Sequence, residues 1–294
     1  MNIKRNYAVL GGDARQLALC EYLADCGNAV CAFGLPRERF SSRIKVEQDW
    51  KQAVQRADAV ILPLPASSDG RRVHLPLGEG AEAPTLKELF ALADKIPVMG
   101  GKFSPAVKEI AERDGILLFD YFESEELQLK NALPTAEGAV SVLMREVPRT
   151  VNGLSVGVTG FGRVAKALIR LLLAMGAHVT VTARKTADLL AARALGCNAV
   201  LFTGTASLRD FAKGQGVVFN TVPHWLFSQE VLREMEKKTL IIDLASAPGG
   251  VDGEAAAANG IRVIWALSLP GKYAPQTAGE IIAQTVLSYW EDRV

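Results

Sequence analysis

Short, mainly apolar runs alternate with longer segments of helical period along this chain. The clearest runs lie at residues 7–10, 59–62, 155–159 and 240–244. Each is followed, directly or after a loop, by a segment whose apolar positions recur every three or four residues. Short apolar strands that alternate with helices are typical of a parallel sheet with helices on both faces. The pattern therefore predicts an α/β protein.

The alternation occurs twice, which predicts two doubly wound parallel-sheet domains. In the N-terminal part the expected strands are 7–10, 29–33, 59–62, 97–99 and 116–119, and the expected helices are 15–26, 85–95 and 105–114. In the C-terminal part the expected strands are 155–159, 179–182, 199–202, 217–221, 240–244 and 262–266, and the expected helices are 164–175, 207–213, 228–237 and 253–259. Six strands in the second domain predict the order 3-2-1-4-5-6.

These elements divide the chain into two domains and two smaller segments. We expect a substrate domain at residues 1–133, flavodoxin-like or Rossmann-like, and a Rossmann dinucleotide-binding domain at residues 148–272. A linker helix at residues 134–147 is expected between them, because a helical pattern follows Pro134 and ends before another proline. The segment 273–294 contains a further helix, expected at 280–291, which we predict to pack back on the first domain.

A glycine turn follows the strand at residues 155–159. Residues 160–165 read Gly-Phe-Gly-Arg-Val-Ala, which is G-x-G-x-x-A at the start of a helix. In a dinucleotide-binding turn the first glycine makes the bend, the second lets the backbone approach a pyrophosphate, and the alanine lets helix and strand pack. The complete strand, helix, strand unit favours this interpretation over a mere tight turn. The residues expected to contact the cofactor here are Gly160, Phe161, Gly162, Arg163 and Val164.

The end of the next strand indicates which dinucleotide binds. An acidic residue at this place accepts the ribose 2′-OH of NAD, whereas here the strand runs into Ala183, Arg184, Lys185 and Thr186. The guanidinium of Arg184 can fork onto a 2′-phosphate or lie on the adenine, with Lys185 and Thr186 completing an anion site. We therefore predict NADP, the alternative being a solvated basic loop.

The nicotinamide end of such a sheet lies beyond its fourth and fifth strands. Two loops of small and polar residues follow those strands, and their main-chain groups are expected to orient the carboxamide. The cofactor-binding residues expected there are Asn220, Thr221, Val222, Pro223, Ala245 and Ser246.

The first domain opens like a dinucleotide domain but lacks the G-x-G spacing. Because Asp13 stands where a pyrophosphate has to approach, we expect this domain to hold substrate and no cofactor. Arg15 opposes the helix dipole in the first turn of its helix, which an anionic substrate explains; the alternative is a surface arginine paired to Asp13. The expected substrate-binding residues are Gly12, Asp13, Arg15, Ser67, Ser68, Gly101, Ser104 and Thr135. Arg71 and Arg72 fit a solvated charge run better than a site.

Three residues are candidates for a general base, and the sequence does not rank them. They are Glu137, Asp13 and His224. A helix that crosses from one domain to another can bring its first turn to a ligand, which is why Asn131, Thr135 and Glu137 are of interest. Glu137 is equally well explained as a first-turn acid favoured by the helix dipole.

Composition excludes several classes of function. The 294 residues are 49% hydrophobic and 22% charged, with 33 Lys and Arg against 32 Asp and Glu, so the chain has no basic field for nucleic acid. Without an apolar stretch of ~18 residues or a signal-peptide pattern, a cytoplasmic protein is expected. The four cysteines lack paired spacing and fit free thiols, so no metal site is expected.

Taken together, these motifs resemble the dipicolinate synthase A-subunit family. The resemblance rests on residues 11–15, 133–138, 160–163, 243–250, 270–271 and 274–279, and it runs through nearly the whole chain. It implies NADP-dependent oxidation of dihydrodipicolinate to dipicolinate in the mother-cell cytoplasm of a sporulating bacterium. It also implies that the partner is a flavoprotein-like B subunit, that the substrate is a small dicarboxylate and that the enzyme is oligomeric.

Three other functions compete with this interpretation. A D-2-hydroxyacid dehydrogenase has the same outline, but His74, His178 and His224 do not provide its histidine and acid pair, and its arginine is missing. Shikimate dehydrogenase is closer, because its cofactor loops look similar to residues 184–186 and 220–223; Lys102 is the nearest counterpart of its catalytic lysine. The third alternative is a non-catalytic NADP-binding protein of a complex in which the partner performs the chemistry.

Overall fold

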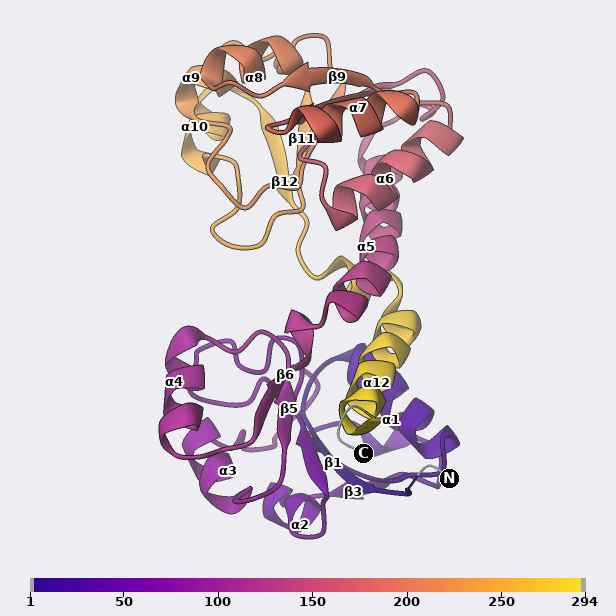
Figure 1. Ribbon diagram of the computed structural model, residues 1–294, viewed down its shortest axis with the longest axis vertical. Coiled ribbons are helices and arrows are strands. Elements are labelled where there is room, and N and C mark those ends of the chain that lie inside the picture. The colour runs from indigo at the N-terminus through magenta and orange to yellow at the C-terminus, as the bar shows by residue number, and fades with distance from the viewer. Residues whose placement is uncertain (1–2, 292–294) are drawn as a thin grey trace. The chain divides into compact units, whose positions relative to one another are not determined.

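The computed structural model describes residues 3–291 and divides into two compact units (Figure 1). The first unit extends to Asn131 and resumes at Ala274, and the second spans Ala132–Tyr273. Each unit contains one six-stranded sheet in which every neighbouring pair of strands is parallel. The predicted fold class, two doubly wound parallel-sheet domains, is confirmed.

The first unit has the strand order β3-β2-β1-β4-β5-β6. Its strands are β1 (Asn6–Leu10), β2 (Ala29–Phe33), β3 (Lys45–Glu47), β4 (Ala59–Ile61), β5 (Val98–Gly100) and β6 (Leu118–Asp120). Its helices are α1 (Ala14–Asp25), α2 (Trp50–Val54), α3 (Leu86–Leu92), α4 (Pro105–Arg113) and α12 (Pro275–Glu291), with single 3₁₀ turns at Arg37–Arg39 and Tyr121–Glu123. Of the two alternatives offered for this domain, the strand order is the Rossmann one.

The second unit repeats that order as β12-β11-β10-β7-β8-β9. Its strands are β7 (Ser155–Thr159), β8 (His178–Ala183), β9 (Asn198–Leu201), β10 (Val217–Asn220), β11 (Leu240–Asp243) and β12 (Arg262–Trp265). Its helices are α6 (Arg163–Ala174), α7 (Thr186–Ala194), α8 (Thr205–Ala212), α9 (Gln229–Leu232), α10 (Gly253–Ala258) and α11 (Leu269–Tyr273), and α5 (Glu125–Glu146) enters from the first unit. From one edge the strands follow 3-2-1-4-5-6, as predicted.

Both faces of each sheet are buried, which explains the nearly continuous apolar strands. In β1, Val9 lies in a core shared with α1 and α12, whereas Ala8 lies in a core on the opposite face with α3. In the second unit, Val158 packs with α6 on one face and Val218 packs with α8 on the other. Such strands have no polar side to alternate with, as expected of parallel sheets.

The helix α12 packs alongside α1 (Figure 1). Gly279 makes this close approach possible, because a Cβ there would be 2.7 Å from the Ala18 Cβ and would clash with the Arg15 carbonyl oxygen. The helix begins at Pro275, five residues earlier than the predicted Glu280, since proline is well tolerated in the first turn of a helix.

The predicted linker helix at 134–147 is wrong in its start. Helix α5 is continuous from Glu125 to Glu146 and contains Pro134 in its interior. A proline there costs about 3 kcal/mol. Burial on either side offsets this cost, because Leu127 lies in a core of the first unit and Leu143 in a core of the second. Four further elements, β3, α2, α7 and α11, were not predicted, and all of them except α7 have five residues or fewer.

Candidate functional site

The glycine turn after β7 has the geometry of a dinucleotide-binding turn. Gly160 adopts φ +84° and donates its N–H to the Thr182 carbonyl oxygen at 2.8 Å. A Cβ on Gly160 would be 2.8 Å from the Thr221 Oγ1, so a side chain does not fit. At Gly162, by contrast, a Cβ would have no neighbour within 4 Å, which leaves the outer side of the turn open. Ala165 is fully buried between helix and sheet.

Helix α6 begins at this turn without a side-chain cap. Gly162 is its N-cap residue and provides no hydrogen-bonding side chain of its own. The first N–H groups of this 12-residue helix therefore receive no side-chain acceptor from the N-cap residue, and such a helix N-terminus favours a phosphate. Phe161 is buried and lies under the ammonium of Lys166, whereas Arg163 is exposed and Val164 is half-buried.

The end of β8 is exposed and basic. Ala183 is buried, and Arg184, Lys185 and Thr186 are exposed. The helix α7 starts directly after them, with Lys185 as N-cap and no side-chain cap hydrogen bond. The first carboxylate that follows is that of Asp188 inside α7, so no acid occupies the end of the strand itself. Two basic side chains and a second uncapped helix N-terminus are suited to a phosphate.

A buried polar network lies under the loops that follow β10 and β11. Asp243 accepts hydrogen bonds from the Asn220 Nδ2 at 2.8 Å, the Ala245 N–H at 3.0 Å and the Gly250 N–H at 2.8 Å. Asn220 in turn accepts one from the Thr159 Oγ1 at 2.5 Å. Thr159, Asn220 and Asp243 are all nearly or fully inaccessible to solvent. Asn220 has no exposed surface, and its side chain is hydrogen-bonded within this network.

The predicted cofactor residues lie on four neighbouring loops. The strands β8, β7, β10 and β11 are adjacent in the sheet, and the predicted cofactor residues lie at or directly after their carboxyl ends. Pro223, His224 and Ser246 are exposed there, and Thr221 and Val222 are half-buried, whereas Ala245 is buried. In open α/β sheets this edge, at the point where the strand order reverses, is where ligands bind.

In the first unit, Arg15 is buried and paired to Asp13. Its Nη2 lies 2.8 Å from the Asp13 Oδ2 and its Nε lies 2.9 Å from the Oδ1, and a further hydrogen bond joins Nη2 to the Leu64 carbonyl oxygen. The alternative in which Arg15 pairs with Asp13 is therefore confirmed. The surface position that this alternative gave to Arg15 is wrong, because the residue is only 6% exposed. The guanidinium is already engaged by protein atoms.

Asp13 also caps α1, accepting the Arg15 N–H and forming a capping box with Gln16. Burial raises the pKa of Asp13, but the hydrogen bonds and charge of Arg15 outweigh it, and the pKa lies below its ordinary value. A carboxylate that is held ionised accepts a proton less readily. Asp13 is therefore a poorer general base than its position in the sequence indicates.

The loop at residues 63–84 covers the glycine turn of the first unit. The Gly12 N–H donates to the His74 carbonyl oxygen at 2.9 Å, so it is not available to an anion. A Cβ on Gly11 or on Gly34 would each be 2.7 Å from the side chain of Leu75, which shows how closely this loop packs on the turn. The place that a pyrophosphate takes in a dinucleotide domain is occupied by the chain's own residues.

The remaining substrate candidates of the first unit follow β4 and β5. The Ser67 Oγ donates to the Asp69 Oδ1 at 2.9 Å, and Ser68 is exposed. Gly101 is buried and joins the two loops, since its N–H donates to Pro63 and its carbonyl oxygen accepts from Ala66. Ser104 is exposed and caps α4. The structure brings these residues to the carboxyl edge of the first sheet, and most of their polar atoms serve the loops.

The candidates on α5 do not lie in a first turn. Because α5 begins at Glu125, Asn131, Thr135 and Glu137 are inside the helix, and the explanation of Glu137 as a first-turn acid is wrong. Glu137 is exposed, and Asn131 and Thr135 are half-buried.

Arg71 and Arg72 are exposed, as a solvated charge run should be, and Arg72 donates to the Ala83 carbonyl oxygen at 2.6 Å.

Sequence reasoning missed several residues that shape these edges. Asp120 accepts hydrogen bonds from the Lys102 and Phe103 N–H groups, and the Trp265 Nε1 donates to the Ala245 carbonyl oxygen at 2.8 Å. Asp243 belongs to the segment 243–250 that carries the resemblance, but its burial under the loops was not predicted. No local pattern marked Trp265 or His74.

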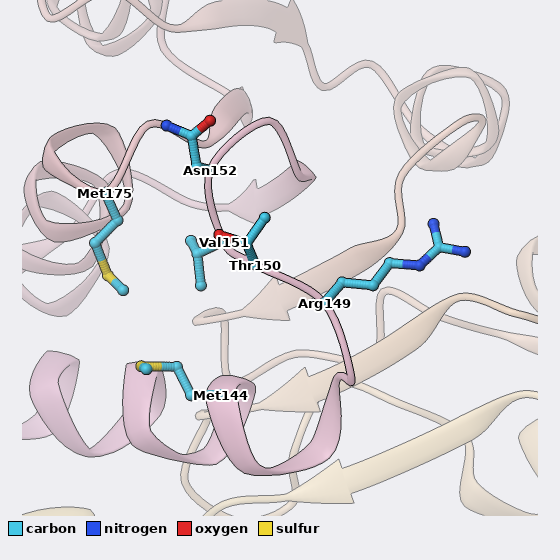
Figure 2. Close-up of a pocket in the computed structure, with 6 residues that line it drawn as sticks. All are labelled: Met144, Arg149, Thr150, Val151, Asn152 and Met175. Atoms are coloured by element: carbon cyan, nitrogen blue, oxygen red, sulfur yellow. The ribbon is translucent and has the colours of Figure 1, made fainter.

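A separate hollow of about 310 Å³ lies at the opposite edge of the second sheet, before β7 and after α6. Figure 2 shows Met144 and Met175 directed toward one another across it, while the side chain of Arg149 extends away. It contains no residue of the loops described above.

Among residues 3–291, no helix is long and apolar enough to cross a membrane, and no group of acidic, histidine or cysteine side chains is arranged to hold a metal ion.

Known proteins resemble both parts of the chain. The family model for the N-terminal domain of the dipicolinate synthase A subunit matches residues 6–122. The model described as D-isomer specific 2-hydroxyacid dehydrogenase, NAD binding domain, matches residues 117–258. The latter covers the second unit's glycine turn and the loops after β8, β10 and β11.

Individual relatives match over almost the full length. The A subunit of dipicolinate synthase from Bacillus subtilis (strain 168) is 33% identical over 285 residues, which are 95% of this chain and 93% of that protein. The crystal structure of the corresponding protein from Bacillus halodurans has a TM-score of 0.88 at 27% identity, with 98% of both chains covered. The crystal structure of the Bacillus subtilis protein has a TM-score of 0.86 at 30% identity, with 99% of this chain and 97% of that chain covered.

Proposed function

This chain belongs to the dipicolinate synthase A-subunit family, and from that premise we propose that it oxidises dihydrodipicolinate to dipicolinate with NADP. Its second unit is a dehydrogenase-type domain for a nicotinamide dinucleotide, which supports an oxidoreductase role. The observation that carries the proposal is the open turn at Gly160–Gly162, followed by the uncapped N-terminus of α6.

The choice of NADP over NAD rests on the residues after β8. The matched family model is described as NAD binding, so family membership alone does not favour the phosphorylated cofactor. Arg184 and Lys185 are exposed next to the uncapped N-terminus of α7, and no carboxylate precedes the helix. A 2′-phosphate would receive charge-assisted hydrogen bonds there, whereas the uncharged 2′-OH of NAD would find no acidic acceptor.

The dissociation constants of NADPH and NADH, measured by calorimetry, test this choice. The unaltered chain is expected to prefer NADPH, and Arg184→Asp is expected to weaken NADPH binding by about tenfold or more, because a charged hydrogen bond is lost and a repulsive charge is added. Arg170→Asp is the control, since Arg170 is an exposed arginine on α6, two turns after the Arg163 that begins this helix and away from the loop after β8. An unchanged preference for NADPH in Arg184→Asp would remove Arg184 from the site.

The chemistry asks for two carboxylate sites and little general-base catalysis. When bound, the dinucleotide supplies the hydride acceptor. The substrate loses a hydride and a proton as its ring becomes aromatic, and aromatisation itself drives the step. At the carboxyl edge of the first sheet, Ser68 and Ser104 present exposed hydroxyls that can donate to a carboxylate, while Arg15 acts from beneath by fixing Asp13 and the loop at Leu64.

His224 is the candidate proton acceptor to examine first. The pKa of Asp13 is lowered, which makes its carboxylate a weak base, whereas His224 is exposed on the loop after β10, at the expected nicotinamide end. An imidazole can accept a proton through one ring nitrogen, which suits the role of a general base. Glu137, exposed on α5, is the remaining candidate.

The relative is named for one subunit of its enzyme, which implies another, and we propose that this chain works in the mother-cell cytoplasm with a flavoprotein-like B subunit. NADPH formation from the aldol product of pyruvate and aspartate semialdehyde should be assayed with this chain alone and then with the B subunit. Activity of the chain alone supports the proposal. Activity only in the mixture favours a non-catalytic NADP-binding role, and activity with shikimate instead favours a shikimate-dehydrogenase-like enzyme.

A further inference from the structure

Asp243 is a carboxylate buried at the end of an apolar strand. It closes β11, whose other residues are Leu240, Ile241 and Ile242, and it is 3% exposed. Burying a carboxylate is costly unless its oxygens are hydrogen-bonded. Both oxygens of Asp243 are satisfied, one by the Asn220 Nδ2 and the Ala245 N–H and the other by the Gly250 N–H.

The partners of Asp243 belong to different loops. Ala245 and Gly250 lie near the two ends of the loop after β11, and Asn220 is the last residue of β10. The carbonyl oxygen of Gly250 accepts the N–H groups of Leu226 and Phe227, which ties the two loops to each other. One carboxylate therefore sets the position of both loops.

The network continues to the glycine turn. The Asn220 Oδ1 accepts from the Thr159 Oγ1 and, at 3.2 Å, from the Val222 N–H. The Thr221 Oγ1 donates to the Thr159 carbonyl oxygen at 2.7 Å, immediately before Gly160. Gly250 fits against this network without a side chain, since a Cβ would be 2.9 Å from the Val222 carbonyl oxygen and would overlap the Asn220 amide.

Fold stability alone does not require a charge at this position. Replacing buried charged groups by apolar residues of similar size is often neutral or stabilising. What a carboxylate provides here is a pair of acceptors for the two N–H groups that bracket an irregular loop. The loop concerned contains Ala245 and Ser246, which are expected to face the nicotinamide.

We propose that Asp243 is a positioning residue for the oxidoreductase reaction: through Asn220, Ala245 and Gly250 it fixes the loops that orient the nicotinamide end of the dinucleotide. The inference rests on the proposed function, because it takes the carboxyl edge of the second sheet as the cofactor site. Asp243 itself contacts no ligand. Its direct hydrogen bonds hold the loops after β10 and β11, and none of them reaches the residues after β8.

Two probes separate the halves of the site. NADPH occupies the whole site, whereas 2′,5′-ADP carries the adenosine and its 2′-phosphate without the nicotinamide. In Asp243→Asn, one acceptor oxygen becomes an NH₂ group that faces an N–H donor, so the loop at 244–250 loses an anchor. We expect the Kd for NADPH to rise by about tenfold or more while the Kd for 2′,5′-ADP stays within about twofold of that of the unaltered chain.

Asp252→Asn is the matched control. Asp252 caps α10 by accepting the Ala255 N–H at 2.9 Å, and asparagine caps a helix equally well, so both dissociation constants are expected to stay unchanged. Should Asp243→Asn fail to fold, Trp265→Phe decides the question with the same two probes. It removes the Nε1 hydrogen bond to Ala245 from a ring that is 48% exposed, and the same selective loss for NADPH is expected.

The outcomes are distinguishable. Equal weakening of both probes, or no weakening of NADPH binding, overturns the positioning role. If the unaltered chain binds neither NADPH nor 2′,5′-ADP, the proposed function fails first, and the inference fails with it.

Discussion

A cationic side chain, that of Arg15, is tolerated in the first turn of α1 because it forms an ion pair with Asp13. The helix dipole disfavours a cation there, and burial disfavours any charge, yet the two side chains are hydrogen-bonded to each other and Arg15 also donates to the Leu64 carbonyl oxygen in the loop after β4. The pair thus joins helix and loop. The same contact lowers the pKa of Asp13 against the opposing effect of burial.

This ion pair makes the stability of the first unit depend on pH in the acidic range. A carboxyl whose folded-state pKa is depressed contributes stability above its unfolded pKa, near 3.8, and loses it as the pH falls through the lower folded value. In urea unfolding at pH 7, Asp13→Asn is expected to lower the free energy of unfolding by about 1–3 kcal/mol, because the cap survives but the buried Arg15 loses its charged acceptor. The difference from the unaltered chain should shrink below about pH 4.

Asp25→Asn is the control, since Asp25 pairs with the exposed Arg43 and contributes little. A deficit of Asp13→Asn that persisted unchanged into acid would show that the ion pair is not its source.

Individual site residues were predictable where the backbone dictates them. Gly160 and Gly162 are set by a turn that leaves one glycine without room and the other open, and this requirement is visible in sequence spacing. The burial of Arg15 was not predictable, because it depends on a loop 49 residues away that supplies the Leu64 carbonyl oxygen. The burial of Asn220 was not predictable either, because it depends on hydrogen bonds to Thr159 and Asp243, which lie on other strands.

At the scale of elements, helix packing depends on a few small residues. Helix α12 belongs to the first unit although 142 residues separate Asn131 from Ala274, and it reaches α1 through Gly279. Its apolar residues Ile282 and Val286 complete the core over β1. The C-terminal helix is therefore part of the fold of the first unit.

Gly279→Val is expected to destabilise the first unit by about 2 kcal/mol or more, because the added atoms meet the backbone of α1, which cannot rotate away. Thermal unfolding followed by calorimetry measures the effect. Gly253→Ala provides the comparison, since a Cβ there meets nothing within 4 Å, and its unfolding should stay close to that of the unaltered chain. Equal melting temperatures for the two variants would mean that α12 can move aside without cost.

Elements were predicted well where apolar periodicity is strong and poorly where packing decides. The strands β1, β7 and β11 follow apolar runs, whereas β3 has three residues, two of them charged, and is defined only by pairing with β2. Helix α5 was truncated in prediction because Pro134 ordinarily ends a helix. Burial of its neighbours in two separate cores is a tertiary effect that local sequence does not record.

At the scale of the whole molecule, residues 3–291 form two sheets of identical strand order with different glycine turns. In the second unit the turn is open at Gly162 and the helix after it lacks a cap. In the first unit the Gly12 N–H is bonded to His74, Leu75 lies against Gly11, and Asp13 caps the helix. Topology alone would assign both units the same ligand, and the local chemistry of the turns distinguishes them.

The covered glycine turn of the first unit determines how many NADPH molecules we expect each chain to bind. Because the chain's own carbonyl and carboxylate already occupy the anion position at α1, saturation with NADPH should require one molar equivalent per chain and not two. An isothermal titration of the purified chain counts this directly from its equivalence point. A second equivalent would mean that NADPH displaces residues 63–84 from the glycine turn of the first unit. This segment would then be a competitive inhibitor of coenzyme binding that is built into the chain.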